Sequence, residues 1–187
     1  RALPSADYVP INVYGSPDDP QLVLCKLDWA RYHASPATVA KTGPLAIVSG
    51  CGTDNADESR RNANTLVVPL SEFEAELARG GEGWGVKVPT GFVFHQARVG
   101  STLLANLFAT NPDTAVYSES HPLMDVFHMC EDGCSPVRER QILRAVAAAM
   151  GRSPWIKHLV FKHQSANSYP DRFRALLEAF PETPFVF

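Results

Sequence analysis

One segment, residues 91–104, constrains the fold of this chain more than any other; it reads Gly-Phe-Val-Phe-His-Gln-Ala-Arg-Val-Gly-Ser-Thr-Leu-Leu. A hydrophobic strand pattern passes through a short basic turn that contains a glycine and continues as an amphipathic helix pattern. The first turn of a helix leaves four backbone N–H groups without intrahelical partners and carries about half a unit of positive charge. The segment therefore predicts an anion-binding turn, of the phosphate-binding kind, between a strand and a helix.

The residues of the turn supply suitable donors for an anion. Gly100 allows the backbone to approach a ligand closely, and Ser101 and Thr102 add hydroxyl donors. Arg98 provides a planar cation that matches phosphate or sulfate oxygens. A Walker A loop has a lysine directly before its Ser or Thr, whereas Gly100 occupies that position here. ATP or GTP hydrolysis is therefore disfavoured, and a nucleotide kinase with a degenerate loop is the third choice among the functions considered.

The turn resembles the 5′-phosphosulfate loop of sulfotransferases, in which a basic residue, a variable residue, Gly, Ser or Thr, and then Thr follow one another. The closest likeness in motif is to the tyrosylprotein and carbohydrate types. The resemblance implies a P-loop NTPase-like sulfotransferase fold, with 3′-phosphoadenosine 5′-phosphosulfate as co-substrate and no metal. It also implies that five residues hold the phosphosulfate: Arg98, Val99, Gly100, Ser101 and Thr102.

A second strand pattern, at residues 114–118, ends in a carboxylate, Glu119. In tyrosylprotein sulfotransferases and their relatives a similar helix and strand lead to a glutamate that acts as general base. The resemblance places Glu119 in that role, where it would take a proton from an acceptor hydroxyl as the sulfur is attacked. The alternative is that Glu119 caps a helix beginning near Ser120.

A third strand pattern, at residues 158–162, ends in a basic and polar turn. Sulfotransferases carry a similar strand with a lysine at its end, and Lys162 is the matching residue. A lysine there would neutralise charge that develops on the bridging oxygen during transfer. His163 is a second candidate base, because cytosolic members use a histidine just after that lysine. Its alternative is a solvent-exposed polar residue in a loop.

Strand and helix patterns alternate in the second half of the chain. Strands are expected near residues 91–95, 114–118, 158–162 and 184–187, and helices near 101–110, 120–129, 136–150 and 170–180. Such alternation predicts an α/β fold with a parallel sheet flanked by helices. Ligands of these sheets bind at the carboxyl ends of the strands, where Arg98, Glu119 and Lys162 are expected to converge.

The first half of the chain predicts a β-rich extension with long, proline-containing loops. Short strands are expected at residues 11–14, 21–27, 45–49 and 65–68, and a capping box at residues 71–74 predicts a helix that runs to about Arg79. Residues 80–83 are expected to form a flexible link. We therefore expect an accessory region at residues 1–85, a candidate surface for a protein partner. Residues 86–187 would form the first part of a sulfotransferase-like domain whose 3′-phosphate site lies beyond Phe187.

Composition and charge restrict the function classes. Hydrophobic residues make up 45% of the chain and charged residues 20%, as in globular proteins. The net charge of −3 and the lack of a basic cluster with interleaved aromatic residues argue against nucleic-acid binding. No apolar run approaches the roughly 20 residues that span a bilayer. The acceptor class stays open, because protein tyrosine, carbohydrate, small alcohols and amines all suit such a site.

The chain has four cysteines: Cys25, Cys51, Cys130 and Cys134. Cys130 and Cys134 could close a small disulfide loop, supply two ligands to a metal, or be free thiols. A zinc site would need further ligands, and His121 and His128 are only loosely placed to supply them. The secretory-pathway lumen, with the Golgi as the example, is slightly favoured over the cytoplasm, because related tyrosine and glycan sulfation occurs there.

Two functions follow from the motifs. The first is a sulfotransferase that moves a sulfuryl group to a hydroxyl or amine acceptor, with Arg98 and Lys162 stabilising the phosphosulfate and Glu119 as base. The second is a sulfotransferase-like scaffold subunit without turnover in a larger assembly. The presence of Arg98, Glu119 and Lys162 in one chain favours the enzyme, because a scaffold needs none of the three.

Overall fold

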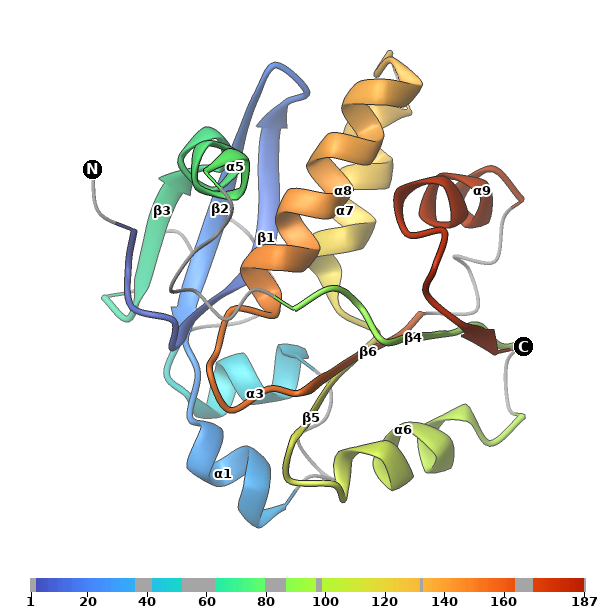
Figure 1. Ribbon diagram of the computed structural model, residues 1–187. Coiled ribbons are helices and arrows are strands. Elements are labelled where there is room, and N and C mark those ends of the chain that lie inside the picture. Colours follow the sequence, from blue (N-terminus) through green and yellow to red (C-terminus); the bar gives the residue numbers. More distant parts are fainter. Residues whose placement is uncertain are drawn as a thin grey trace.

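The protein is described from a computed structural model, which describes residues 3–35, 42–51, 63–79, 87–96, 99–131, 133–163 and 170–186. These residues form an antiparallel sheet from the first part of the chain and a parallel sheet from the second part, with helices around both (Figure 1). The predicted α/β class is confirmed, with a parallel sheet flanked by helices and a β-rich N-terminal extension.

The antiparallel sheet has the strand order β1-β2-β3 among the described residues. Its strands are β1 (Tyr8–Ser16), β2 (Asp19–Lys26) and β3 (Thr65–Pro69), and the helices of this part are α1 (Trp29–Ala34), α3 (Thr42–Val48) and α5 (Leu70–Ala78). Strands β1 and β2 form a hairpin in which Gly15 has a φ of 102°. Only glycine adopts this backbone conformation without strain, and a Cβ atom there would lie 2.6 Å from the Asp19 carbonyl oxygen.

The parallel sheet has the strand order β5-β6-β4-β7 among the described residues. Its strands are β4 (Gly91–Val93), β5 (Thr114–Ser118), β6 (His158–Lys162) and β7 (Phe185–Val186), and its helices are α6 (Ser101–Ala109), α7 (His121–Cys130), α8 (Pro136–Met150) and α9 (Pro170–Ala179). Helix α6 lies on one side of the sheet, and α8 and α9 lie on the other (Figure 1). The strands predicted at 114–118 and 158–162 and the helix predicted at 136–150 are confirmed with their bounds.

The strand predicted at residues 45–49 is wrong, because these residues belong to α3 and the turn that ends it. The helix ends in a Schellman motif: the Cys51 amide donates to the Ala46 carbonyl at 2.9 Å, and the Gly50 amide donates to Ile47 at 3.0 Å. Gly50 has the positive φ, 76°, that this motif requires. A short apolar run does not distinguish strand from helix by itself, and the glycine after it was the deciding signal.

Two other expectations change at helix starts. The predicted capping box does not form: α5 starts at Leu70 after Pro69, with no side-chain cap bond, and Glu74 pairs with Arg138 instead. Helix α1 has no counterpart among the predicted elements; Asp28 caps it by accepting a hydrogen bond from the Arg31 amide. The link predicted at residues 80–83 lies outside the described residues.

The two sheets share one hydrophobic core. Helices α7 and α8 contact β1, and α5 packs between β2 and α8. The buried Arg152 guanidinium, at the end of α8, donates to the carbonyl oxygens of Pro4, Ser5 and Tyr8 at 2.7, 2.5 and 3.0 Å. Burial lowers the pKa of Arg152 to about 10. The N-terminal segment is thus held against the α/β part by a buried cation as well as by apolar packing.

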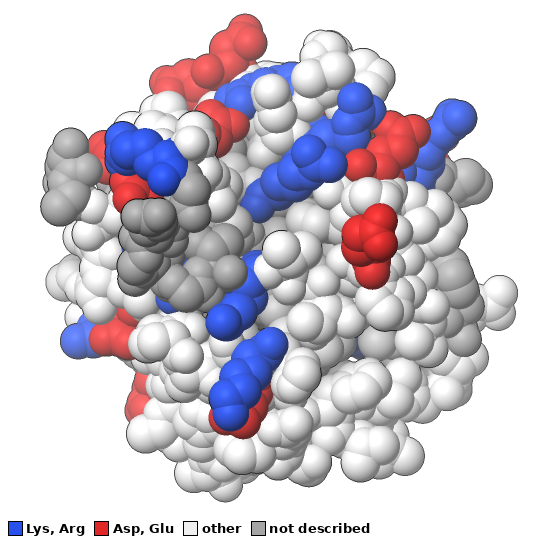
Figure 2. All heavy atoms as spheres, in the orientation of Figure 1, with Lys and Arg blue, Asp and Glu red and all other residues white. Residues whose placement is uncertain are grey.

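Arginine side chains also brace the helices. Arg138 pairs with Glu74 of α5, Arg140 pairs with Glu178 at 2.6 Å, and the Arg144 guanidinium donates to the Ala179 carbonyl at 2.7 Å. Figure 2 shows a diagonal row of Lys and Arg side chains across the upper part of one face, with acidic side chains beside it. The arginines of α8 therefore bind carboxylates and a carbonyl oxygen of the chain itself.

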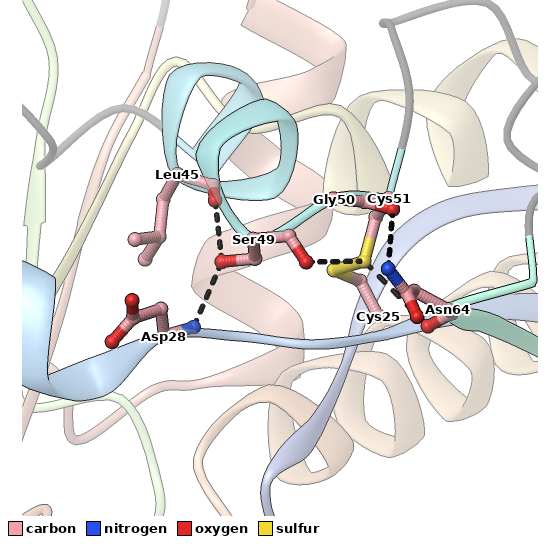
Figure 3. Close-up of a disulfide and its surroundings, with 7 residues drawn as sticks. All are labelled: Cys25, Asp28, Leu45, Ser49, Gly50, Cys51 and Asn64. Carbon is pink, nitrogen blue, oxygen red and sulfur yellow. Dashed lines mark hydrogen bonds between the residues drawn. A yellow bond between two sulfur atoms is a disulfide. The ribbon is translucent and has the colours of Figure 1, made fainter.

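All four cysteines form disulfides, Cys25–Cys51 and Cys130–Cys134. The second was one of the alternatives left open by the sequence, and the first was not predicted. The Cys25–Cys51 bond fixes the end of α3 to β2 (Figure 3). Around it, the Ser49 hydroxyl donates to the Leu45 carbonyl at 2.6 Å and accepts from the Asp28 amide at 2.8 Å.

We predict that the two disulfides contribute unequally to stability. Cys25 and Cys51 are 26 positions apart, and Cys130 and Cys134 only 4. The chain-entropy relation gives about 3.5 kcal/mol for the longer loop and about 2 kcal/mol for the shorter one. Urea unfolding of the Cys25→Ala/Cys51→Ala and Cys130→Ala/Cys134→Ala variants measures the difference. Equal losses, or a larger loss for the second variant, would contradict it.

We also predict a pH-dependent contact between α7 and β1. The Asp125 carboxylate accepts a hydrogen bond from the Val13 amide at 2.8 Å, and burial raises its pKa to about 6, against the lowering effects of Val13, His121, Asn12 and His128. Because the folded-state pKa is raised, the contribution of Asp125 to stability is greatest below pH 4 and is lost as the pH rises through 6.

The measurement compares the wild type with Asp125→Asn, which keeps an acceptor oxygen but does not ionise. Between pH 4 and pH 7 the wild type should lose about 2–3 kcal/mol of unfolding free energy relative to the variant. Parallel stability profiles for the two proteins across this range would contradict the assignment.

Candidate functional site

The strand and the helix predicted within residues 91–104 are present, and residues 97–98 between them lie outside the described residues. Strand β4 ends at Val93, and α6 begins at Ser101 after Gly100, its N-cap residue. Gly100 has a φ of 85°, in the left-handed region, and a Cβ added there would meet no atom of the described residues within 4 Å. Glycine therefore suits this position because of its backbone conformation.

The predicted binding residues take different orientations. The Ser101 side chain is buried, whereas Thr102 is exposed and Val99 is 62% exposed. The amides of Leu103 and Leu104 donate to the Gly100 carbonyl at 2.9 and 3.3 Å, so the Ser101 and Thr102 amides precede the first helical bonds. Arg98 lies outside the described residues.

A pocket of about 580 Å³ lies between the end of β4, the first turn of α6 and β7. It is lined by Val93, Phe94, His95, Gln96, Val99, Gly100, Ser101, Leu104 and Val186. Among the described residues the lining is mainly apolar, and its polar side chains are those of His95, Gln96 and Ser101. A mainly apolar pocket with a few polar groups beside a helix start suits a ligand that joins an anionic group to a flat, less polar one.

Glu119 and Lys162 lie together, as the sequence predicts. Ser118 is the partner of Lys162 in the parallel β5–β6 register, and the Glu119 amide donates to the Lys162 carbonyl at 2.7 Å. The Lys162 ammonium forms an ion pair with the Glu119 carboxylate. The lysine side chain is 1% exposed and that of Glu119 26%, so a buried cation depends on a carboxylate that water can reach.

Glu119 is the only non-glycine residue with a positive φ, 54°, among the described residues. This left-handed conformation costs an L-residue of this kind about 1–2 kcal/mol. Backbone strain of this type persists where the surroundings fix it, and it is common at functional sites. Ser120, the residue after Glu119, is the N-cap residue of α7, and its side chain makes no cap bond.

The topology places this ion pair beside the pocket. Val93, which lines the pocket, is the register partner of Lys162 in the β4–β6 pair. The connection from β4 runs to β5, past β6, while the connection from β6 runs to β7, past β4. The connections that follow β4 and β6 thus run in opposite directions along the sheet. Two neighbouring strands of this kind form a topological switch point, and ligands bind there, outside the carboxyl ends of the strands.

His163 is buried rather than exposed in a loop. Its ring is 5% exposed and stacks on Phe94, with ring centroids 4.9 Å apart. Burial, and to a smaller extent the neighbouring His95, lower the pKa of His163 to about 3. His163 is therefore a neutral part of an aromatic cluster at the end of β6, and a substrate would need to enter that cluster to reach it.

His95 and Ser118 are polar residues of this region that the sequence analysis did not identify. His95 Nδ1 lies 2.8 Å from the Gln96 carbonyl oxygen, and since a carbonyl only accepts, Nδ1 is the donor of this hydrogen bond. The buried Ser118 hydroxyl has no hydrogen-bond partner in the described part of the chain. Their places at the ends of β4 and β5 were signals that could have identified both.

The described residues contain no group of three or more His, Cys, Asp or Glu side chains that could hold a metal ion. In the same residues, no helix combines the length and apolar character that a membrane span requires. Comparison with known proteins finds no match: no family model, no curated protein and no solved structure is significantly similar to this chain. The interpretation of the site depends on its own geometry.

We predict an asymmetry between the two partners of the ion pair. Glu119→Gln removes the counterion that the buried Lys162 ammonium has among the described residues, and it should cost about 3 kcal/mol of unfolding free energy. Lys162→Met removes the buried charge at similar volume and leaves a carboxylate that water reaches, so its cost should be about 1 kcal/mol.

The double variant should then be close to Lys162→Met alone, because the penalty of the unpaired cation is gone. Urea unfolding of the wild type, both single variants and the double variant gives the coupling. Additive losses would show that the two side chains do not depend on each other.

Proposed function

We propose that this protein is a sulfotransferase with a P-loop-like fold, which transfers a sulfuryl group from 3′-phosphoadenosine 5′-phosphosulfate to a hydroxyl or amine acceptor. The observation that carries the proposal is the position of Lys162. A fully buried ammonium lies at the carboxyl edge of the sheet, next in register to a residue of the pocket that the start of α6 borders. The Lys162 ammonium and the positive end of the α6 dipole both favour an anion at this edge.

The chain's own residues divide the work in this proposal. The first-turn amides of α6, the Ser101 hydroxyl and the Arg98 guanidinium bind the 5′-phosphosulfate, with Val99 and Thr102 completing the loop. The mainly apolar pocket holds the less polar part of the nucleotide. The missing Walker lysine favours a phosphosulfate donor over hydrolysis of ATP or GTP.

The transfer is an in-line displacement at sulfur. The acceptor oxygen or nitrogen forms a bond to sulfur while the bond between sulfur and the bridging oxygen breaks, and adenosine 3′,5′-bisphosphate leaves with the electron pair. Lys162 stabilises the negative charge that develops on the bridging oxygen. The acceptor's proton passes to the Glu119 carboxylate, which is partly accessible to solvent.

We also propose that the protein works in an oxidising compartment, with the secretory-pathway lumen favoured over the cytoplasm. Both cysteine pairs are close enough in space to form disulfides. Structural disulfides persist in the secretory pathway and are rare in the reducing cytosol.

The test of the enzyme proposal is calorimetric titration of adenosine 3′,5′-bisphosphate into the protein, together with a turnover assay on a panel of hydroxyl and amine acceptors. We expect micromolar binding. Arg98→Ala should weaken it by about 10-fold to 100-fold, because a charge-assisted contact to the anion is lost. Arg174→Ala is the matched control, since its side chain is 77% exposed on α9.

Glu119→Gln separates binding from catalysis. It should keep nucleotide affinity within a few-fold of the wild type and reduce turnover by about 100-fold or more, as expected for loss of a general base. Nucleotide binding without turnover in the wild type would favour the inactive scaffold subunit. No nucleotide binding by the folded wild type would refute the proposed co-substrate.

A further inference from the structure

The disulfide Cys130–Cys134 differs from Cys25–Cys51 in its surroundings. Cys25 and Cys51 are completely buried, whereas Cys130 and Cys134 are only partly buried at the margin of the core. The second bond also closes a ring between the end of α7 and the start of α8. We propose that Cys130–Cys134 is a reversible thiol–disulfide exchange site, in which an incoming thiolate attacks the Cys130 sulfur and Cys134 leaves.

The helix ends give the exchange its direction. Cys130 is the last residue of α7, where the helix dipole is negative. Cys134 directly precedes Ser135, the N-cap residue of the 15-residue helix α8, where the dipole is positive. A thiolate is therefore better stabilised on Cys134 than on Cys130, and the more stable thiolate is the better leaving group.

The position of a neighbouring pocket also favours attack on Cys130 rather than on Cys134. A pocket of about 600 Å³ lies beside the disulfide and is lined by Phe127, Cys130, Glu131, Glu139, Asp171 and Arg172. Of the two cysteines, Cys130 is the one that borders this space. A small thiol or an exposed cysteine of another protein can approach Cys130 from the pocket.

The charges around this pocket favour a positively charged thiol. Among the described residues three carboxylates line it, from Glu131, Glu139 and Asp171, against the one guanidinium of Arg172. Arg172 is already paired with Glu131 at 2.6 Å. An anionic thiol such as glutathione is repelled by the excess negative charge, while a cationic thiol such as cysteamine is attracted.

The exchange balances as two thiol attacks. The incoming thiolate forms a bond to the Cys130 sulfur as the Cys130–Cys134 bond breaks, and Cys134 takes the electron pair as a thiolate. A second thiol then attacks the mixed disulfide, which releases the Cys130 thiolate and the oxidised reductant. The Gly133 and Cys134 amides both donate to the Cys130 carbonyl, at 3.3 and 3.4 Å, so the backbone keeps the two sulfurs near each other for reoxidation.

The experiment treats the native protein with limiting cysteamine or glutathione, quenches with an alkylating agent, and maps the modified cysteines by mass spectrometry. We expect the mixed disulfide on Cys130, the alkyl group on Cys134, and an intact Cys25–Cys51 bond. Cysteamine should react several-fold faster than glutathione at low ionic strength, and the difference should shrink in high salt. Adducts mainly on Cys134, or equal loss of both disulfides, would overturn the proposal.

Two sets of variants make the test specific. Asp171→Asn should reduce the preference for cysteamine, while Glu182→Gln, which changes a carboxylate outside this pocket, should leave it unchanged. In the single variants Cys130→Ser and Cys134→Ser, the remaining thiol of Cys134 should be alkylated at lower pH than that of Cys130. The reverse order would refute the assigned direction even if exchange occurs.

Discussion

The buried ammonium of Lys162 is the constraint on which this end of the molecule depends. A cation that is 1% exposed requires a counterion, and the carboxylate that serves it comes from the residue after the neighbouring strand. The parallel register of β5 and β6, the bond from the Glu119 amide to Lys162 and the left-handed backbone of Glu119 all bring that carboxylate into place. The left-handed backbone of Glu119 is thus tolerated because it places the counterion that the buried Lys162 requires.

The sequence predicted the elements whose local signals agree with their packing. Helix 136–150 has a proline in its first turn, an apolar stripe and a glycine after it, so both ends and the buried face were specified. The run at 45–49 is too short to show a hydrophobic period. It belongs to a helix that ends where Gly50 takes a positive φ and Cys51 is bonded to Cys25. Helix α1 depends on a long-range contact: the buried Tyr32 hydroxyl donates to the Thr114 carbonyl at 3.1 Å, at the edge strand of the sheet.

The candidate site also contains features that the sequence predicts and features that depend on long-range packing. The meeting of Glu119 and Lys162 follows from a general rule, because the carboxyl ends of parallel strands share one edge. The burial of His163 follows from no local pattern, since it depends on the rings of Phe92 and Phe94 packing around it. The Cys25–Cys51 pairing was equally inaccessible, because it joins residues that only the folded chain brings together.

Electrostatics gives the proposed reaction an order. In the described structure the Glu119 carboxylate is occupied as the counterion of Lys162. A phosphosulfate at this edge brings negative charge of its own, so that Lys162 no longer depends on Glu119 alone. In the proposed mechanism the Glu119 carboxylate accepts the acceptor's proton once the donor shares the charge of Lys162. An acceptor that arrives first meets a carboxylate already paired with Lys162, so the proposed mechanism favours binding of the donor before the acceptor.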